Sequence, residues 1–361
     1  MSSERILVTG AGGLAGVNFV RALRSSDRKY YLIGADFNRY HIVYPDVDAR
    51  YLTPRHTDRG FIAELRRVVE RERIDFLHPQ PSSEALVISR RRDMISARTF
   101  LPPAKVMTVA QDKLASQRLL KKVGIPVAKT KAVKSTADVV AAFKEIGGPL
   151  WVRARHGAGG RLSLLCSSVK EARHWIDLWT LRRVAVDEFI LQEYLPGRNV
   201  AWDSIWKGGK LVTSYARERL EYPFKHISPS GITGTPSVAR IIHDDGVNRV
   251  SKEAARAIDE KPNGAYSIDL KESSSGQFCV TEVDAGKFHS TMPLWGYIAV
   301  KHLRMPWFAN MADLYVRLGL GGQLEDTVPP FDLLPKDYYL LRDMDVGAFL
   351  WREDGWKEKV L

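Results

Sequence analysis

The first eighty residues alternate between short apolar runs and segments of helical periodicity, and this alternation limits the possible folds most strongly. The expected elements are a strand at 6–8, a Gly-rich turn at 8–16, a helix from 17, a second strand at 31–35, a helix at roughly 59–72 and a third strand at 74–78. Alternation of this kind predicts a parallel sheet with helices on its faces.

The Gly-rich turn allows two interpretations. Gly10, Gly13 and Gly16 follow a strand and open a helix, and Asp36 ends the next strand, as in a dinucleotide site. An NAD(P)-dependent epimerase or dehydrogenase is therefore one alternative. The other interpretation is that the glycines only permit a tight turn and close packing of the helix on the sheet.

The dehydrogenase alternative has one further feature, a YxxxK pair made by Tyr297 and Lys301. Only about sixty residues follow this pair, too few for the substrate lobe of such an enzyme. We therefore expect Tyr297 to pack in the core.

Pro102-Pro103 closes the first unit, and a mixture of helices and paired strands follows. Helix start signals stand at Asp112, at Ser135 with Asp138, and at Ser168 with Glu171. The other expected features are strands at 150–154 and 162–166, a Gly-rich loop at 156–161, hairpin turns at 207–210 and 275–276, and a helix near 247–259.

Three carboxylates are expected to share one face of a hairpin. If Ser275-Gly276 is a two-residue turn, Asp269 lies opposite Glu282, and Asp284 is two residues further on the same face. Like charges across paired strands are destabilising, so a cation should offset them. Oxygen-only ligands favour Mg²⁺. The alternative is that Lys271 supplies the neutralising charge.

Two segments are suited to a nucleotide. Arg153 ends a strand and precedes HGAGGR (156–161), whose backbone amides could cradle phosphates while Arg161 adds charge. The strand EFILQEYLPG (188–197) could offer backbone groups and an apolar wall to a flat heterocycle. The structural alternatives are a flexible hairpin and a buried strand.

In their order, these segments resemble the ATP-grasp superfamily, and most closely the carboxylate–amine ligases similar to the carbamoyl-phosphate synthase large chain. The resemblance runs from about residue 5 to about 310. It implies an α/β and α+β architecture, with a Rossmann-like pre-ATP-grasp domain before a two-lobed ATP-grasp fold. The implied units are 1–103, a small lobe at 104–186, a large lobe at 187–310, and a tail at 311–361 that packs on the body.

The resemblance also implies roles for single residues. Asp269, Glu282 and Asp284 would hold Mg²⁺ or Mn²⁺. ATP would be bound by Lys113, Arg153, His156, Gly157, Gly159, Gly160, Gln192, Glu193, Tyr194, Leu195 and Asn199. Arg153, Lys287 and Arg217 are the candidate catalytic residues, and Arg217, Arg219 and Arg240 are candidates for gripping a carboxylate.

Several positions depart from the family pattern. Asn199 stands where a ribose-binding Glu is common, Asp284 where the third metal ligand is usually Asn, and Gly286 near a common Arg. Lys287 could supply the positive charge of that Arg, but its ammonium is a single donor group, whereas a guanidinium is planar and can donate from two nitrogens at once. Thr233 falls near the place of a catalytic His in the synthase, which argues against true carbamate chemistry.

The expected function is an ATP- and Mg²⁺-dependent ligase that activates a small-molecule carboxylate as an acyl phosphate and couples it to an amine or other nucleophile. A non-catalytic nucleotide-binding protein is the second alternative. The family suggests a homodimer.

The net charge of +12 favours anionic partners, but the basic residues are dispersed and form no nucleic-acid motif. The chain has two cysteines, no signal peptide and no apolar run of membrane-spanning length, so a cytoplasmic location without membrane attachment is expected.

Overall fold

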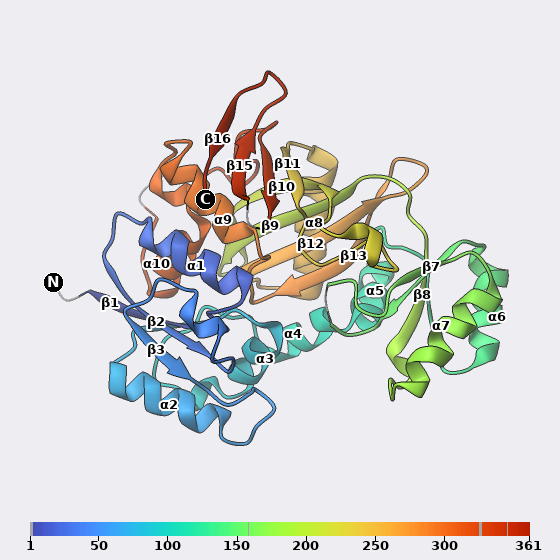
Figure 1. Ribbon diagram of the computed structural model, residues 1–361, viewed down its shortest axis with the longest axis horizontal. Coiled ribbons are helices and arrows are strands. Elements are labelled where there is room, and N and C mark those ends of the chain that lie inside the picture. Colours follow the sequence, from blue (N-terminus) through green and yellow to red (C-terminus); the bar gives the residue numbers. More distant parts are fainter. Residues whose placement is uncertain (1–2, 158, 325–326, 345) are drawn as a thin grey trace.

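The computed structural model describes residues 3–157, 159–324, 327–344 and 346–361, which form three sheets (Figure 1). The N-terminal sheet is wholly parallel, in the order β3-β2-β1-β4, as the alternation in the sequence predicts. Its elements are β1 Glu4–Thr9, α1 Leu14–Arg24, β2 Tyr30–Asp36, β3 Ala49–Leu52, α2 Phe61–Glu72, β4 Phe76–Pro79 and α3 Ser82–Arg90. The short edge strand β3 was not expected, because none of its residues is fully buried and it has no apolar run.

The largest sheet of the described chain is antiparallel and has eight strands, in the order β13-β12-β9-β10-β11-β14-β15-β16. Its strands are β9 Asn199–Lys207, β10 Lys210–Glu221, β11 Val238–Ile242, β12 Gly264–Glu272, β13 Phe278–Ala285, β14 Tyr339–Asp343, β15 Gly347–Trp351 and β16 Lys357–Lys359. The C-terminal segment therefore extends this sheet by pairing β14 with β11, which the sequence did not indicate.

A four-stranded sheet, β5-β8-β6-β7, forms a smaller lobe with a core of its own. Its elements are β5 Thr130–Ala132, α6 Thr136–Ile146, β6 Leu150–Ala154, β7 Leu164–Cys166, α7 Val169–Leu181 and β8 Phe189–Glu193. Because β8 pairs with β5 and β6, it belongs to this sheet, whereas the sequence-based division placed it in the following unit.

Helices connect the three sheets. The remaining helices are α4 Ala104–Gln111, α5 Lys113–Lys122, α8 Asp245–Ile258, α9 Met292–Lys301 and α10 Met311–Gly319. Helices α4, α5 and α8 pack on β13, and α9 and α10 pack on α1. An aromatic cluster joins the N-terminal sheet to the C-terminal half, with Tyr315 against Phe76, His78 and Phe288.

The local signals in the sequence are mostly confirmed. Asp112 caps α5 by accepting from the amides of Leu114 and Ala115, Ser135 and Asp138 form a capping box, and Ser168 caps α7. Gly208 and Gly209 both have positive φ in the turn between β9 and β10, as a type I′ hairpin turn requires. Among the described helices, none has the length and apolar character needed to cross a bilayer.

Candidate active site

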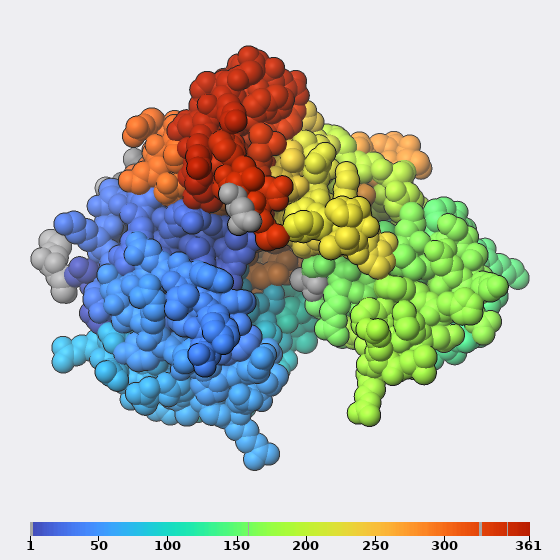
Figure 2. All heavy atoms as spheres, viewed as in Figure 1, coloured from blue at the N-terminus to red at the C-terminus, as the bar shows by residue number. Residues whose placement is uncertain are grey.

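A cavity of about 1170 Å³ lies where the three sheets meet. Its lining comes from the N-terminal Gly turn, the small lobe, strands β12 and β13, and a loop at 222–236. Figure 2 shows the molecule hollowed between its N-terminal part and the small lobe. A cavity of this size can hold a nucleotide together with a second small molecule.

The hairpin of β12 and β13 places Asp269 directly opposite Glu282, as predicted. The predicted turn of two residues was nevertheless wrong, because the turn has three. The turn contains Ser274, Ser275 and Gly276, because the Ser273 amide donates to the Gln277 carbonyl. A bulge at Thr281 adds one residue to β13 and restores the expected register.

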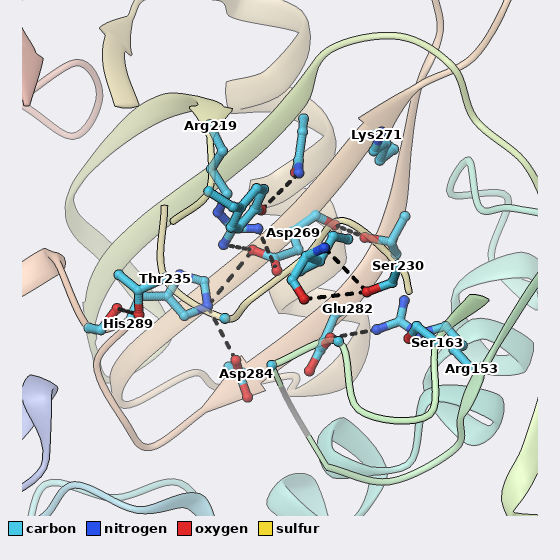
Figure 3. Close-up of a pocket in the computed structure, with 18 of the residues that line it drawn as sticks. Arg153, Ser163, Arg219, Ser230, Thr235, Asp269, Lys271, Glu282, Asp284 and His289 are labelled. Carbon is cyan, nitrogen blue, oxygen red and sulfur yellow. Dashed lines mark hydrogen bonds and ion pairs between the residues drawn. The ribbon is translucent and has the colours of Figure 1, made fainter. Parts of the chain in front are cut away.

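Two of the three carboxylates are held by arginine. The Arg219 guanidinium contacts both oxygens of Asp269, at 2.6 and 2.9 Å. Burial opposes the charge of Asp269, but the positive charge of Arg219 outweighs it and keeps the pKa of this carboxyl below its usual value. Arg153 contacts Glu282 at 3.0 Å (Figure 3). Lys113 contacts the same carboxylate at 3.3 Å.

The third carboxylate, Asp284, pairs with Lys287 at 3.0 Å and with His289 Nε2 at 3.2 Å. Burial opposes the charge, yet Lys287 and His289 hold the pKa of Asp284 far below its usual value. Basic side chains of the protein itself therefore offset the negative charges of the three carboxylates. Lys271, the predicted alternative for this task, pairs with none of the three carboxylates.

His289 is a cavity residue that the sequence analysis missed. Its Nδ1 lies 2.9 Å from the carboxylate of Asp203 and 3.2 Å from Arg217. Desolvation lowers the pKa of His289, although Asp269 and Asp284 oppose this shift. In the sequence, only its position five residues after Asp284 indicated that His289 lies near the carboxylates.

Arg217 lies beneath the cavity wall. Its side chain is 2 % exposed and pairs with Asp203, and burial lowers its pKa to about 9. It reaches the cavity through His289, whereas Arg219 lines the cavity itself. Arg240 pairs with Glu218 at 2.7 Å and is not among the described lining residues.

The segment Gln192–Leu195, called the hinge below, also lines the cavity, where β8 ends. Gln192 is buried and donates to Thr130. Asn199, at the start of β9, also lines the cavity and donates to the Tyr222 hydroxyl at 3.1 Å. The hinge residues and Asn199 are thus brought to one cavity with the carboxylates.

The Gly-rich loop reaches the cavity only in part. Gly159 and Gly160 line it, and a Cβ on Gly160 would come within 2.9 Å of the Ile232 carbonyl oxygen. His156 instead pairs with Glu188, and the Gly157 carbonyl accepts from Lys113. Neither His156, Gly157 nor Lys113 is a described lining residue. Ala158 lies outside the described residues.

The N-terminal Gly turn faces the same cavity, but Asp36, the acid predicted to bind a ribose, already accepts hydrogen bonds from backbone amides. Asp36 is buried and accepts from the amides of Gly12 and Asn38, at 3.0 and 2.8 Å. A Cβ on Gly10 would collide with Pro81 at 2.3 Å, so this glycine permits close packing. Tyr297 packs against the core, as predicted.

Gly286 explains one departure from the family pattern. Its φ is +82°, and a Cβ there would meet Met107 at 2.9 Å and Pro102 at 3.1 Å. A longer side chain does not fit at this position. Lys287, the next residue, carries the positive charge to Asp284 instead.

Within the described part of the chain, no three His, Cys, Asp or Glu side chains already form a metal cage. The carboxylates share a cavity wall but face different cations. A divalent ion held here would need further ligands from a bound molecule.

Comparisons with known proteins relate part of this sequence to one family model. Residues 112–194 match the family model of the carbamoyl-phosphate synthase L chain, ATP binding domain. The carbamoyl phosphate synthase large chain of Pyrococcus furiosus is 23% identical over 250 residues, covering 64% of this chain and 23% of the relative. That of Clostridium botulinum (strain Kyoto) is 23% identical over 337 residues, covering 90% and 30%. The chain thus spans less than a third of these relatives.

Solved structures share the fold. The biotin carboxylase domain of Hydrogenobacter thermophilus 2-oxoglutarate carboxylase, solved with MgADP, ADP and bicarbonate, has a TM-score of 0.69 at 13% identity, covering 94% of this chain and 74% of that one. N5-carboxyaminoimidazole synthetase from Staphylococcus aureus, solved with ADP, has a TM-score of 0.68 at 16% identity, covering 94% and 82%. The chain therefore has a mixed α/β fold similar to that of ATP-grasp proteins, and its residues 112–194 resemble the ATP binding domain of the carbamoyl-phosphate synthase L chain.

Proposed function

We propose that this chain is an ADP-forming ligase that activates a carboxylate with ATP and transfers the acyl group to an amine or another nucleophile. One observation carries the proposal. Asp269, Glu282 and Asp284 line one cavity together with Arg153 and the segment Gln192–Leu195. Carboxylates, a phosphate-binding cation and a hinge in one cavity are what nucleotide-dependent phosphoryl transfer needs.

We assign the nucleotide to the space between the hinge and the carboxylates. The base would lie against Gln192–Leu195 and the phosphates would reach toward Arg153 and Glu282. The Gly-rich loop would cover the phosphates, and its partners at 228–235 lie close enough to hold it over them. Exclusion of water matters because an acyl phosphate hydrolyses readily.

Magnesium fits the donor set, because the three carboxylates offer oxygen ligands only. Mg²⁺ usually takes one or two carboxylates and completes its shell with water and substrate phosphates. We propose that Glu282 and Asp284 hold it, with Asp269 as the third candidate. When bound, the ion would neutralise charge on the phosphate oxygens.

In the reaction, a carboxylate oxygen of the substrate attacks the γ-phosphorus, the bond to the β–γ bridging oxygen breaks, and ADP leaves. The nucleophile then attacks the acyl carbon, phosphate leaves with the bonding electrons, and the amine nitrogen loses a proton. The protein contributes positioning and positive charge, from Arg153, Lys113 and Lys287. Arg217 acts as a positioning residue through His289, and Arg219 is the arginine that can reach a substrate.

We further propose that residues 1–103 are the Rossmann-like pre-ATP-grasp domain, that the small lobe includes β8, and that the larger sheet carries the carboxylates. In this arrangement the N-terminal Gly turn closes the substrate end of the cavity. The dehydrogenase alternative is not favoured, since Asp36 is occupied by its own turn.

The test is ADP release by the purified chain with Mg²⁺-ATP and a panel of carboxylic acids, each offered with ammonia or an amino acid. We expect at least one pair to release ADP, and Glu282→Gln to slow that release by about a hundredfold or more, as removal of a group that stabilises transition-state charge does. Glu253→Gln, on the exposed side of α8, is the matched control and should leave the rate unchanged. Nucleotide binding without ADP release from any pair would instead support the non-catalytic alternative.

A further inference from the structure

The carboxylate of Asp284 is held at each of its two oxygens by a different side chain. Lys287 lies 3.0 Å from Oδ1, and His289 Nε2 lies 3.2 Å from Oδ2. The lysine ammonium sits on a flexible four-carbon stem, whereas the imidazole is a rigid ring. Of the two partners, His289 is therefore the one that can fix the direction of this carboxylate.

The ring of His289 is anchored from behind the cavity wall. Its Nδ1 lies 2.9 Å from the carboxylate of Asp203, a residue with no exposed surface. Asp203 is itself held in place, because it accepts from the Ser267 hydroxyl at 2.6 Å and pairs with Arg217. The imidazole thus has a fixed support on the side that faces away from the cavity.

The backbone on both sides of His289 is hydrogen-bonded to the N-terminal part of the chain. The Phe288 carbonyl accepts at 2.7 Å from the side-chain amide of Gln80, the residue that follows β4. The Ser290 carbonyl accepts at 2.9 Å from the side-chain amide of Asn18 on α1. Three consecutive residues of the loop between β13 and α9 are therefore fixed, and the ring between them has little freedom to move.

On the cavity side, the other ring nitrogen of His289 lies between two acids. Figure 3 shows the ring between Asp284 and Asp269, with an oxygen of each at 3.2 and 3.8 Å from Nε2. Although burial opposes it, neighbouring cations hold the pKa of both carboxyls below its usual value, so both are ionised and can only accept. Nε2 therefore carries a hydrogen, which it donates to Asp284. An ionised oxygen has a second lone pair, so Oδ2 can accept this hydrogen bond and still bind a cation.

Resting on the proposed Mg²⁺-ATP site, we propose that His289 is a positioning residue, which fixes Asp284 as a ligand of Mg²⁺ through the hydrogen bond from Nε2. Carboxylates that bind metals are themselves hydrogen-bonded, and loss of such an outer partner typically lowers metal affinity or activity about 10- to 100-fold. His289 is assigned no proton transfer, and its effect on the nucleotide comes through Asp284.

Two amide side chains can separate the roles of the two ring nitrogens. The amide nitrogen of Gln reaches the place of Nε2, whereas that of Asn reaches the place of Nδ1. His289→Gln therefore keeps a donor for Asp284, and His289→Asn keeps a donor for Asp203 only. Calorimetry would measure the dissociation constant of Mg²⁺-ATP for the parent chain and both variants. We expect His289→Asn to weaken binding about tenfold or more, and His289→Gln to stay within about threefold of the parent.

A second variant and a matched control accompany this pair. His289→Ala has no donor at either place and should weaken binding at least as much as His289→Asn. The control is His174→Gln, an exposed position on α7, which should bind Mg²⁺-ATP as the parent does. Each variant should unfold cooperatively without nucleotide, because Asp203 keeps its contacts with Ser267 and Arg217 in all of them.

Equal weakening by His289→Gln and His289→Asn would overturn this inference, as would weaker binding by the Gln variant alone, because a role limited to Asp203 favours the Asn variant. Unchanged binding by His289→Ala would overturn it as well. In each of these cases the parent still binds Mg²⁺-ATP, and the ligase proposal stands. If the parent does not bind Mg²⁺-ATP, the proposed function itself fails, and this inference fails with it.

Discussion

At the scale of single residues, the candidate site is a set of matched opposite charges. Three carboxylates on one wall are tolerated because each has at least one cation within 3.3 Å, and the cations come from four different parts of the chain. The sequence predicted that a cation must offset these acids. It did not identify the partners, because Arg219, Lys113 and Arg153 are 50 to 169 positions away from the acids that they meet.

Removal of Arg219 tests how strongly this pairing stabilises the fold. Asp269 and Arg219 are both largely buried, so Arg219→Met should leave an uncompensated charge and cost roughly 3–5 kcal/mol in the free energy of unfolding. The double variant Arg219→Met/Asp269→Leu should recover most of that loss, since neither charge of this pair is then left without its partner. Urea denaturation of the two variants measures both values.

A loss below about 1 kcal/mol in Arg219→Met would contradict this reasoning, because it is the value typical of an exposed ion pair. The same would hold if the double variant were no more stable than the single one.

At the scale of elements, the β12–β13 hairpin shows what can and cannot be predicted from local sequence. The alternation of apolar and acidic residues was enough to pair Asp269 with Glu282. The turn was predicted one residue too short. The bulge at Thr281 compensates for the longer turn, and it was not predicted because a bulge has no local sequence signature of its own. Caps and the Gly208-Gly209 turn were predicted because they depend on residues close in sequence.

Deletion of Thr281 should be tolerated about as well as deletion of Ser274. Without the bulged residue, Leu270 opposite Val280 and Asp269 opposite Glu282 become consecutive pairs of a regular ladder, so Glu282 and Asp284 stay on the cavity face. Deletion of Ser274 shortens the turn outside the ladder. We expect both variants to keep Mg²⁺-ATP binding within about threefold, as nucleotide titration would measure. Loss of binding on deletion of Thr281 alone would contradict this reading of the register.

At the scale of the whole molecule, the parallel N-terminal sheet, the following mixture of sheets and helices, and the fold resemblance followed from the sequence. Two features did not. Strand β8 joins a sheet whose other members precede it by up to sixty residues, and β14–β16 extend a sheet that begins more than a hundred residues earlier. Both depend on pairing between distant segments, which no local pattern specifies. The cavity exists because these sheets meet, so its residues could be proposed singly but not as one site.

The central claim is that this cavity binds Mg²⁺-ATP, and ligand-dependent thermal unfolding tests it most directly. Melting temperatures would be recorded with ATP, NAD⁺ and NADP⁺, each with Mg²⁺ and with EDTA, for the parent chain and Glu282→Gln. A ligand at about a hundred times its dissociation constant should add roughly 2.7 kcal/mol, which is a shift of several degrees. We predict a shift with ATP only when Mg²⁺ is present, and its loss in Glu282→Gln. Stabilisation by NAD⁺ or NADP⁺ and none by Mg²⁺-ATP would contradict the account.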